Sequence, residues 1–158
     1  VTVPGENHLI ENVHLGTARL VLDTWKEWRD SFGSPQQEIA VRSGMGNRMI
    51  VNNNSDTGVT KGTDFGLIDV EGGTLELSYI IENIGNLPLT LNSVQMNDAS
   101  GDYTVEGPPV TIIPARGSIV FTVKFDPSVA GSRNATIRID SDDADEGVYT
   151  FDITGTGQ

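Results

Sequence analysis

Apolar and polar residues alternate along four stretches of the chain, which gives each stretch one apolar and one polar side. The clearest stretch is Ser118–Phe125, where Ile, Phe, Val and Phe recur at every second position and Ser, Thr and Lys lie between them. The others contain Leu75–Ile81, Ala135–Ile139 and Tyr149–Ile153. A period of two is typical of a strand with one buried face and one solvated face, so four strands are predicted.

Shorter apolar segments predict further strands, and turn-forming residues separate them. These segments are Glu38–Val41, Met49–Val51, Leu87–Met96, Tyr103–Val105 and Val110–Ile113. Gly, Pro, Asn and Asp fill the connections, as at Asn83–Asn86 and Gly107–Pro109. Seven or more short strands at this spacing, from about Gln37 to Gly157, predict an all-β protein that forms an immunoglobulin-like β-sandwich.

The first 36 residues have a different pattern. The apolar residues Leu9, Val13 and Leu15 share one parity and Leu20 and Leu22 the other, which predicts two short strands or one kinked strand. An aromatic segment with capping-box spacing follows and predicts a short amphipathic helix, with its apolar positions at Trp25, Trp28 and Phe32. We therefore divide the chain into an N-terminal extension, residues 1–36, and a sandwich domain, residues 37–158.

Composition excludes several classes of function. Ten Lys and Arg against 22 Asp and Glu give a net charge of −12, which opposes binding to nucleic acid or anionic membranes. The absence of Cys excludes disulfides, thiolate metal sites and cysteine nucleophiles. No apolar run is long enough to cross a bilayer, so we expect no membrane insertion. His8 and His14 lie ~20 Å apart along an extended strand, which is too far for them to share one metal ion. We expect no cofactor and no enzymatic activity.

The acidic run Asp140–Gly147 has two interpretations. Carboxylates close together in sequence are the ligands that Ca²⁺ prefers, so a weak surface cation site is one of them. The spacing departs from the EF-hand pattern, because Ala144 occupies the fifth position and Phe151 the twelfth. A hairpin turn between the last two strands is the favoured interpretation, since Asp and Gly suit turn geometry.

Two segments match the N-glycosylation sequon, Asn53-Asn54-Ser55 and Asn134-Ala135-Thr136. Chance occurrence in a chain rich in Ser and Thr is the favoured explanation, and attached surface glycans are the alternative.

Several segments of the sandwich domain, taken in order, resemble a known family. They are Glu38–Val41, Gly62–Gly66, Ile81–Leu91, Phe121–Pro127, Ala130–Ile137, Ser141–Glu146 and Tyr149–Gly157. Residues 38–157 thereby resemble the bacterial choice-of-anchor D domains, relatives of the Hydin-type immunoglobulin-like repeats. The resemblance implies an immunoglobulin-like sandwich without shared catalytic residues, in a secreted or cell-surface building block of bacterial origin. Because the residues before Glu38 do not resemble a preceding repeat, we expect a complete small subunit of one extension and one module.

The extension suggests how such a subunit would act. An apolar arm is marginal as an isolated hairpin, and unpaired strand edges attract partners. We expect the arm to pair with the sandwich of another copy, so that the protein is a structural subunit that polymerises head to tail into a filament or surface coat. The expected self-association residues are Leu9, Val13, Leu15, Leu20, Leu22, Trp25 and Trp28.

Two alternatives remain open. In the first, the arm docks on its own sandwich, and the protein is a monomeric cell-surface adhesin or carbohydrate-binding module that contacts surface glycans through Trp25 and Trp28. In the second, which fits the acidic composition less well, the protein is an intracellular scaffold of the Hydin type.

Overall fold

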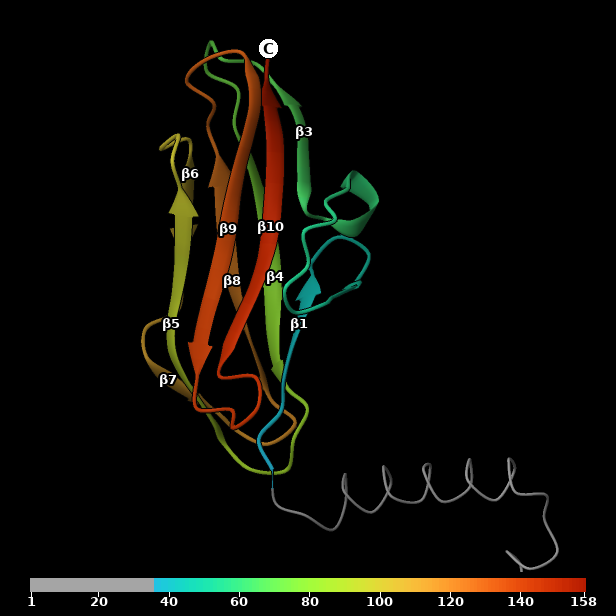
Figure 1. Cartoon of the computed structure of the whole chain (residues 1–158), viewed down its shortest axis with the longest axis vertical. Helices are drawn as coiled ribbons and strands as arrows, with labels where there is room; N and C mark the ends of the chain where they lie inside the picture. Colours follow the sequence, from blue (N-terminus) through green and yellow to red (C-terminus); the bar gives the residue numbers. More distant parts are fainter. Residues whose placement is uncertain (1–35) are drawn as a thin grey trace, which may run out of the picture. The chain divides into compact units, whose positions relative to one another are not determined.

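The computed structural model describes residues 36–158, which form two five-stranded β-sheets packed face to face (Figure 1). The first sheet has the order β2-β1-β4-β8-β6. It contains β1 (Ile39–Ser43), β2 (Met49–Ile50), β4 (Leu75–Asn83), β6 (Tyr103–Glu106) and β8 (Ser118–Phe125). The second sheet has the order β3-β10-β9-β5-β7. It contains β3 (Asp64–Ile68), β5 (Leu89–Asp98), β7 (Thr111–Ile113), β9 (Gly131–Ser141) and β10 (Val148–Gly157), and a 3-10 turn, η1 (Val59–Lys61), precedes β3. The predicted all-β, immunoglobulin-like sandwich is confirmed.

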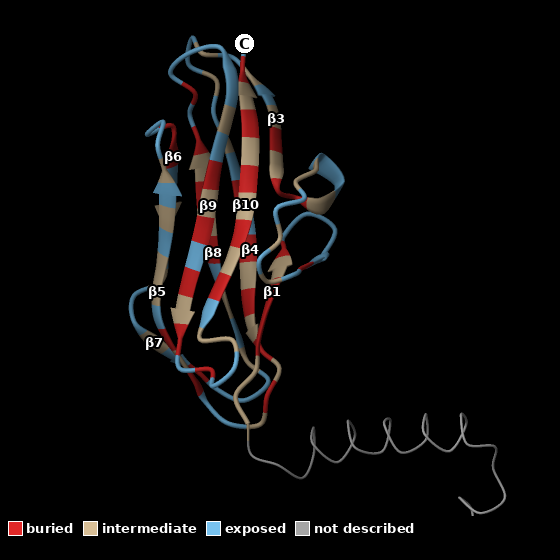
Figure 2. Ribbon diagram, viewed as in Figure 1, coloured by how far each residue is buried: buried red, intermediate tan, exposed pale blue. Residues whose placement is uncertain are grey.

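Alternating side chains from the two sheets make up the core. Buried residues recur at every second position of the long strands, visible as red bands in Figure 2. Tyr79 of β4 lies opposite Phe121 of β8, and their rings stack with centroids 5.2 Å apart. A second aromatic group joins Phe65 and Tyr103 to Phe125, at centroid distances of 5.8 and 4.6 Å. These contacts bury large apolar surfaces and hold the sheets together.

Two buried tyrosines tie the segment between β1 and β3 to this core. The Tyr79 hydroxyl donates a hydrogen bond to the carbonyl oxygen of Gly62 at 2.9 Å, and the Tyr149 hydroxyl donates to that of Ile50. Burial raises the pKa of Tyr149 to about 12 and raises that of Tyr79 still further. Both phenols therefore stay protonated at neutral pH and keep their hydrogen bonds.

The closing Thr-Gly-Thr-Gly segment of β10 brings glycine against an aromatic ring. Gly155 faces inward, and a Cβ atom there would lie 2.5 Å from Cε1 of Phe125. Any other residue would push the ring out of its contacts with Phe65 and Tyr103. This explains why the segment has small residues on its buried side and threonine on its exposed side.

Every strand except β3 overlaps a segment that the sequence predicts as a strand. β3 was missed because only Phe65 in it is buried and Gly66 has a positive φ of 73°, which disrupts the alternation. β5 begins at Leu89 rather than Leu87, because Leu87 lies in the preceding turn, where its carbonyl oxygen accepts a hydrogen bond from Asn83 Nδ2. The predicted arm and short helix lie outside the described residues, and the boundary after residue 36 remains a prediction.

Candidate interaction surface

On one side of the second sheet, main-chain contacts cover β10. Along β10, Asn53 N–H donates to the carbonyl oxygen of Thr150, and Asp152 N–H donates to that of Asn54. β3 then continues the coverage in parallel with Thr154–Gly157 (Figure 1). Among residues 36–158, the edge strand on this side is therefore the five-residue β3, whose outer side has no strand partner.

On the other side of the second sheet the unpaired stretch of strand is longer among the described residues, because the chain changes sheets there. β7 pairs only with Leu89–Leu91 of β5, while β6 pairs with β8 in the opposite sheet. Within residues 36–158, Asn92–Asp98 therefore has no strand partner on this side. We call this stretch of β5, together with the neighbouring β6, the open side.

The open side carries half-buried apolar side chains. Val94 and Met96 of β5 and Val105 of β6 pack against the core and remain partly exposed. The chain crosses between the sheets at Gly107, where an added Cβ would lie 3.1 Å from Cβ of Val94. An added strand with alternating apolar residues would cover the exposed parts of these side chains.

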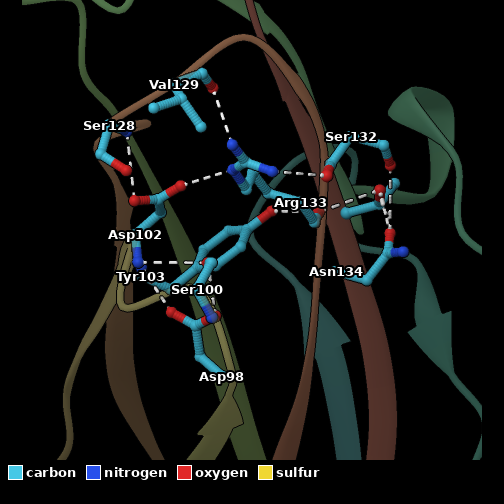
Figure 3. A network of polar contacts seen from close by, with 10 residues as sticks. Asp98, Ser100, Asp102, Tyr103, Ser128, Val129, Ser132, Arg133 and Asn134 are labelled. Atoms are coloured by element: carbon cyan, nitrogen blue, oxygen red, sulfur yellow. Dashed lines mark hydrogen bonds and ion pairs between the residues drawn. The ribbon is translucent and has the colours of Figure 1, made fainter.

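An ion pair between a buried aspartate and a partly exposed arginine lies at the end of the sandwich next to the open side (Figure 3). Arg133 Nε donates to Asp102 Oδ2 at 2.7 Å, and Ser128 N–H donates to Asp102 Oδ1 at 3.1 Å. Asp102 is only 4% exposed. The other guanidinium nitrogens donate to the carbonyl oxygens of Ser132 and Val129. The pair thus links the β5–β6 turn to the β8–β9 turn.

A second carboxylate shapes the β5–β6 turn itself. Asp98 accepts hydrogen bonds from Ser100 Oγ at 2.6 Å, from Ser100 N–H at 2.8 Å and from Tyr103 N–H at 2.9 Å (Figure 3). Partial burial favours the neutral acid, but these hydrogen bonds outweigh it and lower the pKa of Asp98. The Tyr103 hydroxyl donates to the carbonyl oxygen of Arg133, which joins this turn to the ion pair.

The acidic run Asp140–Gly147 lies at the opposite end; its first two residues end β9, and residues 142–147 form the predicted connection between β9 and β10. Its buried Asp143 accepts the N–H groups of Ile39, Asp145 and Glu146 at 2.8, 3.1 and 3.1 Å. Asp142 accepts Thr90 N–H at 2.7 Å. These carboxylates serve as hydrogen-bond acceptors for the backbone in separate directions, as in the turn interpretation. In the described part of the chain, no group of three or more acidic or histidine side chains is arranged to hold a metal ion.

The predicted self-association residues lie outside the described residues, as do His8 and His14. They are Leu9, Val13, Leu15, Leu20, Leu22, Trp25 and Trp28. Of the two sequons, Asn53 and Asn134 are both exposed. The structure adds the open side, which sequence reasoning missed because no local pattern reveals that β6 and β7 join different sheets. Within residues 36–158, no helix combines the length and hydrophobicity that a membrane span requires.

Comparisons with known proteins agree with this architecture. The model of the HYDIN/CFA65/VesB-like, Ig-like domain family matches residues 59–155. A protein of unknown function from Porphyromonas gingivalis W83 has a similar structure, with 19% identity and a TM-score of 0.55 over 77% of this chain. The match covers 47% of that protein, so this chain spans less than half its length.

Two further structures resemble this chain more distantly. The ASH/PapD-like domain 7 of human CEP192 is 12% identical, with a TM-score of 0.48, over 79% of this chain and 88% of that domain. The VesB protease of Vibrio cholerae is 11% identical, with a TM-score of 0.47, over 85% of this chain and 35% of the protease. Likeness at such identity extends to the fold alone. A search of curated proteins finds no match.

Proposed function

The chain belongs to the HYDIN/CFA65/VesB-like family of Ig-like domains, and we propose that it is a non-enzymatic, extracellular structural subunit. Within that family we assign it to the choice-of-anchor D group of bacterial secreted or cell-surface proteins. Its sandwich domain comprises residues 37–158, and residues 1–36 form an arm that another copy receives. Repeated head-to-tail donation of the arm builds a filament or surface coat.

The observation that carries this proposal is the open side. Edge strands of β-sandwiches are usually short, charged or covered, because unpaired backbone groups attract other strands. Here, among residues 36–158, one side of Asn92–Asp98 has no strand partner, and its Val94 and Met96 and the nearby Val105 are only half-buried. The arm of the sequence offers apolar residues at alternating positions, such as Val13 with Leu15, that match the spacing of such an edge.

Sedimentation velocity tests the proposal. The full chain is expected to form larger species as its concentration rises, whereas a chain that begins at Gln36 stays monomeric. Met96→Lys on the open side should reduce assembly, because an inward-facing charge opposes strand addition while the long side chain can still reach water. The matched control is Met49→Lys on β2, where the native side chain is 47% exposed, and it should assemble normally.

A full chain that remains monomeric at every concentration would refute polymerisation. Equal loss of assembly in Met96→Lys and Met49→Lys would refute the open side as the acceptor. Circular dichroism of both variants verifies that the sandwich remains folded.

A further inference from the structure

The outer face of the second sheet contains a polar hollow of about 460 Å³. Asn97 of β5, Asn134 and Thr136 of β9 and Asp152 of β10 line its floor, and Ser55 and Thr57 from the segment before η1 form one wall. Along β9 and β10 these residues alternate with buried ones, so their side chains project away from the core. The hollow is therefore distinct from the apolar residues of the open side.

Strand register places three different polar groups in one row across the floor. Asn97 lies opposite Thr136, and Thr136 lies opposite Asp152, so an amide, a hydroxyl and a carboxylate follow one another. Neighbouring strands are about 4.8 Å apart, which makes the row ~10 Å long. Such a row is long enough to contact adjacent rings of a sugar chain.

Hydrogen bonds orient Asp152 and Asn134 in the hollow, one from Thr136 of the hollow and one from the adjacent Thr154. Thr136 Oγ1 donates to Asp152 Oδ1 at 2.6 Å, and Thr154 Oγ1 donates to Asn134 Oδ1 at 2.7 Å. Each bond occupies one oxygen, which leaves Asp152 Oδ2 as an acceptor and Asn134 Nδ2 as a donor. The floor is thus preorganised, which lowers the entropic cost of binding a ligand.

The remaining polar groups face solvent. The side chains of Ser55, Thr57 and Asn97 form no hydrogen bond with another residue of the range 36–158. The hollow therefore presents both donors and acceptors within a small area. Ligand hydroxyl groups can both donate and accept, so a hydroxyl-rich molecule matches this mixture of groups.

We propose that the hollow binds a neutral oligosaccharide. An anionic glycan or a phosphate would meet the carboxylate of Asp152, and no Lys or Arg of residues 36–158 lines the hollow to compensate. A peptide strand would need a free sheet edge, whereas these groups lie on a sheet face. Its apolar side chains would also find no deep apolar pocket, since the apolar lining consists of Ala99, Ala135 and Ile153.

The test uses NMR titration of the ¹⁵N-labelled full chain with cellohexaose, laminarihexaose, xylohexaose and mannohexaose. At least one of these is expected to shift the side-chain amide signals of Asn97 and Asn134, with a dissociation constant of ~1 mM. Asn97→Ala and Thr136→Val should each weaken binding by roughly fivefold, the effect of losing one hydrogen bond. The matched controls are Gln95→Ala and Thr150→Val, which lie in the next row of the same face and should leave affinity unchanged.

Three outcomes would overturn the proposal. The first is the absence of any shift at ~10 mM of each hexasaccharide, far above the expected dissociation constant. The second is stronger binding of oligogalacturonate, an anionic chain, than of the neutral chains, because the carboxylate of Asp152 should repel an anionic ligand. The third is a glycan attached to Asn134 in the native protein, detected by mass spectrometry, because the attached sugar would fill the hollow. None of them depends on whether the chain polymerises.

Discussion

The two ends of the sandwich each bury an aspartate, but they stabilise its charge differently. At the end near the open side, Asp102 is 4% exposed and pairs with the guanidinium of Arg133. At the other end, Asp143 is 5% exposed and accepts three backbone N–H groups, with no ion pair among the described residues. The comparison shows that a buried carboxylate can be stabilised by one cation or by several peptide dipoles.

The two solutions connect different parts of the chain. The ion pair links two neighbouring turns. Both of its partners are side chains, so a double substitution can remove the two charges together. Asp143 instead holds Ile39, the first residue of β1, which lies 104 positions earlier in the sequence. The three donors to Asp143 are backbone N–H groups, which no side-chain substitution removes, so substitution should be more damaging at this end.

The largest effect is expected for Asp143→Ala. The substitution leaves the buried N–H of Ile39 without an acceptor and removes the acceptor of two turn N–H groups, which should lower the free energy of unfolding by about 3 kcal/mol. Asp143→Asn keeps one acceptor oxygen and should lose about half as much. Urea denaturation followed by circular dichroism measures the unfolding free energy of both variants. Circular dichroism is preferred to tryptophan fluorescence, because both tryptophans precede residue 36 and lie outside the sandwich domain. If Asp143→Ala lowered the free energy of unfolding less than Arg133→Met does, the proposal that substitution is more damaging at the Asp143 end would be contradicted.

Arg133→Met should be the next most damaging change. Within the described part of the chain, it leaves the buried Asp102 carboxylate with Ser128 N–H as its remaining hydrogen bond. We expect the free energy of unfolding to fall by about 2 kcal/mol, since Arg133 itself is partly exposed. The double variant Asp102→Asn with Arg133→Met removes both charges and should recover part of that loss. Additive effects in this double-mutant cycle would show that the pair is not coupled.

Asp145→Asn should change the free energy of unfolding least. It should stabilise the protein, whereas the two preceding substitutions destabilise it. A hydrogen bond with Asp143 and repulsion between the two carboxylates raise the pKa of Asp145. Its contribution to stability is therefore present below the unfolded pKa of ~3.9 and is lost as pH rises through the higher folded pKa. Because Asp145 is exposed, Asp145→Asn should raise the unfolding free energy by only ~0.3 kcal/mol at pH 7 and leave it unchanged near pH 3.

The control for this pH dependence is Asp98→Asn at the other end. The pKa of Asp98 is lowered, so its contribution is present above the unfolded pKa and is lost as the pH falls through the folded value. Asp98→Asn should therefore destabilise the protein at neutral pH and not at strongly acidic pH. The same sign of change for both variants at pH 7 would contradict the assigned shifts.

Local alternation explains why most of the strands could be predicted. In β8 the side chains that face the core, such as Phe121 and Val123, are separated by residues that face outward, and the sequence carries this information directly. Phe65 offered no such signal, because it is the one buried residue of β3 and Gly66 follows it with a positive φ. Family resemblance marked this segment without assigning it a strand.

The functional surfaces depended on contacts that the sequence does not display. The acidic run was correctly assigned to a turn from its Asp and Gly content, but the hydrogen bond from Ile39 to Asp143 depends on how the sheets close. The row of Asn97, Thr136 and Asp152 likewise appears only when three separate strands are brought into register. The self-association residues of the extension remain predictions.

The anchoring of Ile39 has a mechanical consequence. Residues Ile39–Ser43 pair in register with Tyr79–Asn83 of β4, and Asp143 holds the first of them at the point where the chain enters the sandwich. A pull on residue 36 along β1 would load these cross-strand bonds in shear, so that they share the tension rather than break one after another. The hydrogen bond from Ile39 to Asp143 of the acidic turn would then bear part of any force applied from the N-terminal side.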